Sequence, residues 1–269
     1  RRYAEILTLE MGKLIGEAEV ELSANILEYY SKFGPEHLTP RYLRAEGFGD
    51  TDVALVNEPL GVLYAIEPWN FPFYQVIRIS APQLMAGNTI VLKHAANVPQ
   101  SALAMVQLYL DAGAPEGLLT NIFANHDATD RILADARIKG VALTGSERAG
   151  SVVAATAAKN LKKSTLELGG ADAFVVLEDA DIEKAARWAA FGRHWNAGQV
   201  CVSSKRLIVV DEVADKFLEE YTKHVAELVA GDPMDPATTL APLSSQKAAD
   251  DLAAQVEMAR EEGVTVEAI

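Results

Sequence analysis

The feature that most constrains the fold of this chain is a repeated alternation of short apolar segments with helical patterns. The apolar segments have the length and boundaries of buried strands, at residues 61–66, 89–93, 119–123, 140–143, 164–168, 173–176 and 206–210. Helical periodicity is expected at residues 3–33, 77–85, 100–112, 127–136, 151–161, 181–196 and 215–229. This order predicts an α/β fold with a parallel sheet that helices cover on both faces.

Composition narrows the classes of partner. The 269 residues, 49% of them hydrophobic, are enough for about two domains. With 38 acidic and 24 basic residues the net charge is -14, so neither nucleic acid nor a membrane is an expected partner. No apolar run approaches the roughly 20 residues that span a bilayer. The single cysteine excludes an internal disulfide and indicates a reducing, cytoplasmic setting.

Both ends of the chain are expected to lie inside secondary-structure elements. Residues 3–10 begin within a helical pattern that no capping residue precedes, and residues 263–269 end in an apolar pattern typical of a strand. An unpaired terminal strand is a poor end for a domain. We therefore interpret the chain as an interior segment of a longer protein.

Cys201 is the first candidate for chemistry. It follows the polar turn at residues 196–200, where backbone N–H groups can favour the thiolate that attacks carbonyls. An inert structural thiol is the alternative. Its partner could be His194, seven residues earlier, or the carboxylate of Glu167. The histidines have no metal-ligand spacing, so no metal site is predicted.

Two further candidates lie where predicted strands end. Glu167 precedes Gly169-Gly170, and ligands gather at the carboxyl ends of strands in open α/β sheets. It could act as a general base, or it could be a solvated carboxylate. Thr144-Gly145-Ser146 joins a strand to a helix, whose N-terminus suits a pyrophosphate. Tight packing of strand against helix explains the glycine equally well.

A rigid loop at residues 68–72 contains Trp69, Asn70 and Phe71 between two prolines. The amide of Asn70 is suited to stabilising an oxyanion, whereas the aromatic rings could equally pack in the core. Lys93 ends another predicted strand, where its ammonium group could reach a nucleotide ribose or phosphate. An exposed surface lysine is the alternative there.

Together these motifs resemble the aldehyde dehydrogenase superfamily along the whole chain. They occur in the family's order: Pro68-Trp69-Asn70-Phe71-Pro72, Gly87-Asn88 with Val91-Leu92-Lys93, Thr144-Gly145-Ser146, Leu166-Glu167-Leu168-Gly169-Gly170, and Gly198-Gln199-Val200-Cys201. The 34 residues from Glu167 to Cys201 also fit the family. Residues 91–99 are most similar to the bacterial succinate-semialdehyde dehydrogenase branch.

The resemblance implies a domain organisation. Residues 1–169 would form a Rossmann-like NAD(P)-binding domain, which includes an oligomerisation-strand segment at about 41–60, and residues 170–269 a truncated catalytic domain. A homodimer or homotetramer is implied for the full-length protein. The chain alone is expected to be inactive or unstable, because the family's downstream glutamate, which positions the nicotinamide ribose, is absent.

The resemblance also implies a mechanism. Cys201 would attack the aldehyde to give a thiohemiacetal, whose oxyanion is held by Asn70 and the N–H of Cys201. Hydride transfer to the nicotinamide would leave a thioester, which water activated by Glu167 hydrolyses. NAD or NADP would contact residues at matching positions: Trp69, Asn70, Lys93, Ala96, Gly145, Ser146 and Leu168.

Three positions bear on specificity. Ala96 replaces a glutamate that bonds the adenosine ribose in many relatives, which makes NADP acceptable without excluding NAD. Arg78 matches an arginine that binds the substrate carboxylate in succinate-semialdehyde enzymes. A second arginine of that kind is Trp195 here, so another aliphatic aldehyde, a CoA-acylating reaction and a purely structural role for the chain stay open as alternatives.

Overall fold

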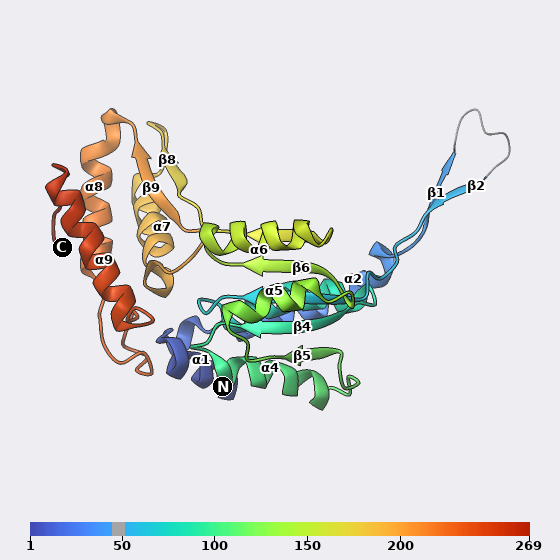
Figure 1. Ribbon diagram of the computed structural model, residues 1–269. Helices are drawn as coiled ribbons and strands as arrows, with labels where there is room; N and C mark the ends of the chain where they lie inside the picture. The colour runs from blue at the N-terminus through green and yellow to red at the C-terminus, as the bar shows by residue number, and fades with distance from the viewer. Residues whose placement is uncertain (45–51) are drawn as a thin grey trace. The chain divides into compact units, whose positions relative to one another are not determined.

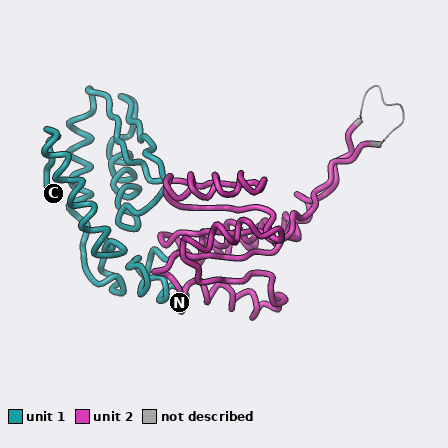
Figure 2. Tube along the Cα trace, in the orientation of Figure 1, with its two compact units in different colours: residues 1–18, 169–269 teal, residues 19–168 magenta. Residues whose placement is uncertain are grey.

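The computed structural model describes residues 1–44 and 52–269. The chain divides into two compact units: residues 19–168 form one, and residues 1–18 together with 169–269 form the other (Figure 2). The second segment of that other unit begins at Gly169, one residue before the predicted start of the catalytic domain at residue 170. The first 18 residues, in contrast, fall with residues 169–269 and not with the predicted NAD(P)-binding domain.

The unit of residues 19–168 is built on a five-stranded sheet with the order β5-β4-β3-β6-β7, in which every pair of neighbours is parallel (Figure 1). Its strands are β3 (Val62–Glu67), β4 (Thr89–His94), β5 (Leu119–Asn121), β6 (Ile138–Thr144) and β7 (Lys163–Glu167). The predicted α/β class with a parallel sheet is confirmed. The strand order reverses at β3, which makes the carboxyl ends of β3 and β6 the topological switch point where such sheets bind ligands.

The described residues of the same unit also form the helices α2 (Val20–His37), α3 (Pro72–Met85), α4 (Pro99–Asp111), α5 (His126–Ala134) and α6 (Glu147–Lys159). Helix α3 packs against β3 and β4, whereas α5 and α6 pack against β6. Both α3 and α4 begin with a proline, whose fixed φ suits the first helical position. Helix α3 therefore starts five residues before the predicted start at residue 77. The core beneath α6 comprises Tyr64, Leu133, Ile138, Val141, Leu143, Val153 and Ala157.

The predicted oligomerisation segment contains an antiparallel pair of strands, β1 (Arg41–Arg44) and β2 (Asp52–Leu55). Tyr42 is 76% exposed and Leu55 52% exposed, so the pair presents apolar side chains to solvent. Residues 45–51 of the predicted oligomerisation segment lie outside the described residues.

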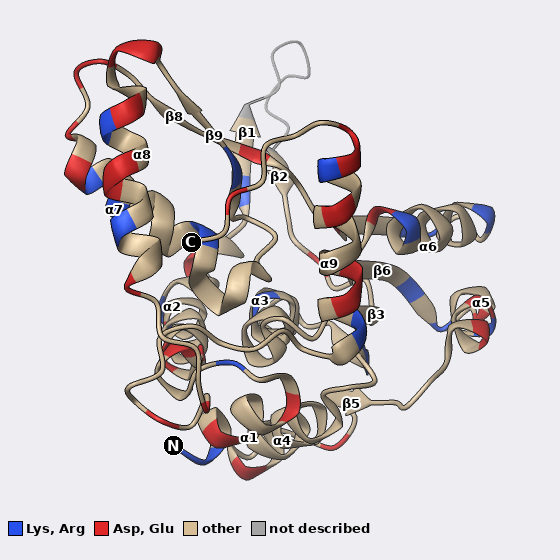
Figure 3. Cartoon of the chain, turned by 90° about the vertical axis from the view of Figure 1, so that its left-hand side faces the viewer, with Lys and Arg blue, Asp and Glu red and all other residues tan. Residues whose placement is uncertain are grey.

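The other unit contains a two-stranded parallel sheet of β8 (Asp172–Val176) and β9 (Ser204–Val209). Its helices are α1 (Arg2–Met11), the 3-10 turn η1 (Ile15–Glu17), α7 (Ile182–His194), the short turn η2 (Trp195–Gly198), α8 (Asp211–Ala226) and α9 (Gln246–Glu261). Val176, Ile182, Ala186, Ala189 and Phe217 form its core. Figure 3 shows positions of Asp and Glu, in red, along α8 and α9. In these helices Lys223–Glu219 at 2.9 Å and Lys247–Asp251 at 2.8 Å are exposed ion pairs one turn apart.

Three predicted features differ from the structure. The helix expected at residues 3–33 is broken after α1, because Gly12 ends that helix in the left-handed region with φ 79°. Residues 264–269 carry no regular structure, so the strand expected there is wrong. Helix α9 has no counterpart among the predicted elements. In the described part of the chain, no helix combines the length and apolar character needed to cross a bilayer.

Candidate active site

The first group of predicted site residues lies on the loop between β3 and α3. Trp69 and Asn70 are half-buried there, while Phe71, the residue that precedes α3, is 4% exposed and packs in the interior. Glu19, the residue that precedes α2, fixes the start of α3, because its carboxylate accepts a buried hydrogen bond from the Phe73 N–H at 3.2 Å. The loop is therefore fixed at its helical end, and it carries Asn70 at the carboxyl end of β3.

The Thr144-Gly145-Ser146 turn lies at the end of β6, next to β7. The N–H of Gly145 donates to the carbonyl of Glu167 at 2.9 Å, so a backbone hydrogen bond joins this turn to the predicted base. Ser146 is the N-cap of α6, and its hydroxyl accepts from the Ala149 N–H at 3.3 Å. The structure thus brings Gly145, Ser146 and Glu167 together at the carboxyl ends of β6 and β7.

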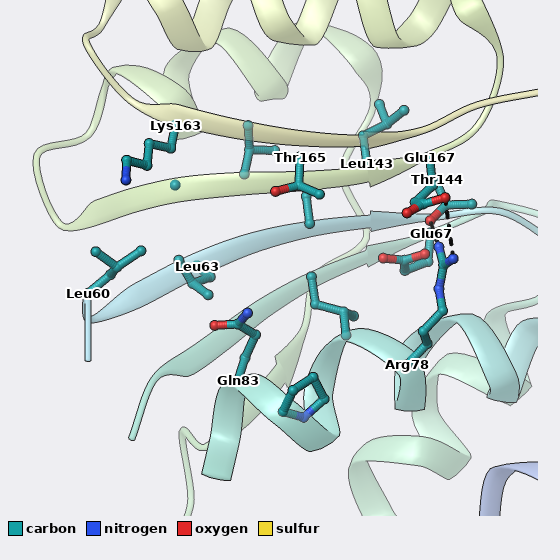
Figure 4. A pocket seen from close by; sticks show the side chains of 15 residues that line it. Leu60, Leu63, Glu67, Arg78, Gln83, Leu143, Thr144, Lys163, Thr165 and Glu167 are labelled. Carbon is teal, nitrogen blue, oxygen red and sulfur yellow. Dashed lines mark hydrogen bonds and ion pairs between the residues drawn. The ribbon is translucent and has the colours of Figure 1, made fainter. Parts of the chain in front are cut away.

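Arg78, on α3, reaches the carboxyl ends of the same two strands. Its Nη1 lies 3.5 Å from Oε2 of Glu167, and its Nη2 donates to the Thr144 hydroxyl at 3.0 Å (Figure 4). The Arg78 side chain is 33% exposed and that of Glu167 56% exposed. The predicted carboxylate-binding arginine is therefore paired here with the predicted general base, a contact that the sequence did not reveal.

Glu67 completes this cluster and was missed in the sequence. It is the last residue of β3 and only 3% exposed. Burial, opposed by a hydrogen bond from the Thr144 hydroxyl and by the charge of Arg78, raises the pKa of Glu67 to about 8. Its Oε2 has no hydrogen-bond partner within the described residues. A carboxyl that stays protonated near neutral pH accordingly lies beside Arg78 and Thr144. The signal in the sequence was an acidic residue at the end of an apolar strand.

His94, at the end of β4, hydrogen-bonds the end of the loop between β3 and α3. Its Nδ1 accepts from the Ala95 N–H at 2.9 Å, so its Nε2 carries the proton and donates to the carbonyl of Pro72 at 3.0 Å. Burial lowers the pKa of His94 to about 4, which keeps the ring neutral. His94 therefore anchors the first residue of α3 and has a structural role.

A groove of about 300 Å³ runs along the sheet from this cluster. Glu67, Arg78, Thr144 and Glu167 line one end, and residues such as Leu60, Leu63 and Lys163 line the rest (Figure 4). Its polar end combines a guanidinium group with two carboxyl groups, one of them kept neutral by burial. That end offers a cation to an anionic ligand and a carboxylate to a proton donor.

The remaining predicted cofactor residues lie at carboxyl ends of strands in the same unit. Lys93 is half-buried at the end of β4, and burial lowers its pKa. Ala96 is exposed in the turn between β4 and α4. Leu168 packs against α6, where a Cβ on Gly150 would lie 2.7 Å from its Cδ2. The Gly87-Asn88 motif is structural, because Asn88 accepts from the Gly61 N–H at 3.0 Å and is buried.

Cys201 lies in the other compact unit, just after η2, and is half-buried. The ammonium group of Lys205 donates to the carbonyls of Val200 and Cys201 at 3.2 and 3.1 Å. The Nδ1 of His194 hydrogen-bonds the Ala190 carbonyl of its own helix at 2.9 Å. In the described part of the chain, no hydrogen bond or ion pair joins His194 to Cys201, and no group of three or more His, Cys, Asp or Glu residues could hold a metal ion.

Comparison with known proteins gives a consistent result. The sequence model of the aldehyde dehydrogenase family matches residues 1–268. The chain is 49% identical over 265 residues to the succinate-semialdehyde dehydrogenase [NADP(+)] of Deinococcus radiodurans, covering 98% of this chain and 55% of that protein. It is 40% identical over 262 residues to the succinate semialdehyde dehydrogenase [NAD(P)+] Sad of Escherichia coli, covering 97% and 56%.

Among solved structures, the chain is similar to the succinic semialdehyde dehydrogenase of Streptococcus pyogenes in complex with NADP+. The identity is 47% and the TM-score 0.95, and the match covers 100% of this chain and 60% of that one. The chain therefore spans somewhat more than half the length of the relatives that it matches.

Proposed function

Because the chain belongs to the aldehyde dehydrogenase family, we propose that the protein containing it oxidises an aldehyde to the carboxylic acid with NAD(P)+. The observation that carries this proposal is the match over residues 1–268. The motifs that contain Cys201, Glu167 and Asn70 resemble those of the family, which supports the assignment of these three residues. A protein that used the fold as a scaffold alone has no need for this complete set.

In this mechanism Cys201 is the nucleophile. Its thiolate adds to the aldehyde carbon, and the Asn70 amide and the Cys201 N–H stabilise the oxyanion that forms. NAD(P)+, when bound, would supply the acceptor for the hydride that leaves the former aldehyde carbon as the Cys201 thioester forms. Glu167 then takes a proton from water, which attacks the thioester and releases the acid and the thiol. In the structure the Glu167 carboxylate lies 3.5 Å from Nη1 of Arg78, at the polar end of the groove.

The residues present fit a dinucleotide. The N-terminus of α6, behind Gly145 and Ser146, offers N–H groups to a phosphate. The half-buried ammonium group of Lys93 has no carboxylate partner within the described residues, and such a cation is stabilised by a phosphate or ribose. Ala96 brings no negative charge to the turn after β4, which supports NADP alongside NAD. The relatives named above are NADP(+)- and NAD(P)+-dependent enzymes.

We propose succinate semialdehyde as the substrate, with Arg78 as the group that binds its carboxylate. Arg78 lines the groove and already holds one carboxylate, that of Glu167, at 3.5 Å. A substrate carboxylate would exchange with Glu167 on the guanidinium group, and the exchange would free Glu167 for the hydrolytic step. Trp195 stands where a second arginine is sometimes found, so Arg78 carries the recognition without that partner.

The test is a substrate panel on the full-length protein with NAD and NADP in parallel. We expect kcat/KM to be highest for succinate semialdehyde and to fall about 10²-fold in Arg78→Ala, with a far smaller loss for uncharged aldehydes of equal length. Arg187→Ala, which removes an arginine from the surface of α7, is the matched control. Equal losses for charged and uncharged substrates would contradict the assignment of Arg78, and the absence of NAD(P)H from every aldehyde would contradict the proposed activity.

A further inference from the structure

The loop that leads to Cys201 has an unusual backbone. Asn196, Ala197 and Gly198 are consecutive residues in the left-handed region, with φ of 50°, 53° and 74°. Glycine adopts this conformation freely and asparagine tolerates it, whereas Ala197 is strained in it. Such backbone strain persists only where the surrounding structure determines it. The contacts that hold this loop therefore decide where Cys201 is presented.

Several polar side chains bind the strained backbone. The Gln199 Nε2 donates to the Asn196 carbonyl at 2.9 Å, and its Oε1 accepts from the Ser244 N–H at 2.9 Å. Arg193 donates to the Gly198 carbonyl at 3.3 Å. The N–H of Asn196, the first of the three left-handed residues, donates to Oε2 of Glu17 at 3.1 Å. Glu17 differs from the others because it lies 179 residues earlier in the chain.

The segment that carries Glu17 is itself fixed within this compact unit. The N–H of Ile15 donates to the carbonyl of Pro233 at 2.9 Å. Gly12 packs so closely that a Cβ there would lie 2.8 Å from Cγ of Pro242. Lys13 is fully buried, and its positive charge stabilises the Glu17 carboxylate, although burial raises the pKa of Glu17 overall. The segment that carries Glu17 is therefore fixed by contacts on both its backbone and its side chains.

We propose that Glu17 is a positioning residue for the nucleophile, because its carboxylate holds the Asn196 N–H and so maintains the left-handed turn that presents Cys201. Asn196 is fully buried, so its N–H loses a buried carboxylate partner when Glu17 is removed. The turn would then relax toward ordinary backbone angles, and the N–H groups around Cys201 would no longer be aligned. The role of Cys201 as nucleophile rests on the proposed function, whereas the anchoring of the turn does not.

The experiment compares Glu17→Ala and Glu17→Gln with the wild type in the full-length protein. Hydrogen exchange of residues 195–201 is followed by mass spectrometry, and the alkylation rate of Cys201 by iodoacetamide is measured against pH on the same peptide. Glu17→Gln retains an oxygen that can accept the Asn196 N–H. Glu5→Ala is the control, because Glu5 lies on α1 and pairs with the exposed Arg1.

In Glu17→Ala we expect exchange at residues 195–201 to be about five- to tenfold faster, the effect of one lost hydrogen bond on local opening. The alkylation rate of Cys201 should also change, because the relaxed turn no longer holds the thiol in place. Glu17→Gln and Glu5→Ala should keep the wild-type exchange in this segment. Apart from the segment around Lys13, whose charge faces Glu17, exchange in the rest of the unit should stay as in the wild type.

Exchange at residues 195–201 that is unchanged in Glu17→Ala would overturn the proposal. If Glu17→Ala does not fold, Glu17→Gln decides: wild-type protection of the turn supports the hydrogen-bond role, and lost protection overturns it. Failure of the wild type to oxidise any aldehyde would contradict the proposed function alone, since the exchange measurement needs neither cofactor nor substrate.

Discussion

At the scale of single residues, Glu67 shows how a tertiary environment changes the chemistry of a side chain. Its carboxyl is enclosed at the end of β3, and burial raises its pKa to about 8. The neighbouring Thr144 hydroxyl links it to Arg78, and Arg78 pairs with Glu167. The charge state of Glu67 therefore affects the group that holds the proposed base.

The raised pKa of Glu67 predicts how stability depends on pH. Its ordinary pKa is 4.5 and its folded-state pKa is about 8, so between these values the folded protein binds a proton that the unfolded chain has released. The contribution of Glu67 is fully present below about pH 4.5 and is lost as the pH rises to about 8. Glu67→Gln, which cannot ionise, should therefore gain stability over the wild type across this window.

The measurement is the thermal unfolding midpoint of the wild type and Glu67→Gln at a series of pH values. The gain should level off above about pH 8 and amount to a few kcal/mol at most, because one unit of pKa difference corresponds to about 1.36 kcal/mol. Glu36→Gln, at an exposed position of α2, is the control. A constant difference between wild type and Glu67→Gln from pH 5 to pH 8 would show that the buried carboxyl is ionised throughout.

At the scale of elements, the caps of the helices explain where they start. Ser146, Asp181 and Ser245 accept hydrogen bonds at the starts of α6, α7 and α9. Prolines begin α3 and α4. These local signals are visible in the sequence, and most predicted helices lie where the structure has them. The helix expected at residues 3–33 is broken because Gly12 can take a left-handed conformation that ends α1.

Ser146 offers a test of the helix that is proposed to bind the cofactor. Ser146→Ala removes the cap of α6 and should cost about 1 kcal/mol of stability. It should also weaken NAD(P) binding several-fold, because fraying of the first turn misaligns the N–H groups that face the phosphate. Binding is measured by titration of nicotinamide fluorescence or by calorimetry, and stability by urea unfolding.

Ser245→Ala is the matched control, since Ser245 caps α9 in the other compact unit through the same type of hydrogen bond, to the Ala248 N–H at 3.1 Å. It should reduce stability by a similar amount and leave cofactor affinity unchanged. Equal effects of the two substitutions on affinity would mean that the α6 N-terminus has no specific part in cofactor binding.

At the scale of the whole molecule, the β1–β2 pair presents apolar side chains that nothing in the described chain covers. Tyr42, Leu43 and Val53 are 76%, 46% and 38% exposed, and the strand pair alone is too small to be stable in water. We propose that it contributes to a homodimer or homotetramer of the full-length protein, in which a second copy covers these side chains.

A double substitution tests this proposal. Tyr42→Asp together with Leu55→Asp should shift the full-length protein from oligomer to smaller species in sedimentation velocity, because a buried carboxylate at an apolar interface is strongly unfavourable. Phe123→Asp is the control, at a residue of the same unit that is 70% exposed and lies outside the strand pair. An unchanged sedimentation coefficient in the double variant would remove this strand pair from the interface.

The sequence by itself determined the α/β class, the approximate strands and helices, and membership of the aldehyde dehydrogenase family, because periodicity, caps and ordered motifs are local properties of the chain. The tertiary structure alone decided which side chains meet. Arg78 binds Thr144 across 66 positions, and Glu17 binds Asn196 across 179. Such contacts depend on how whole elements pack. Glu67 likewise acquired its raised pKa from burial and neighbouring charges, which no local pattern encodes.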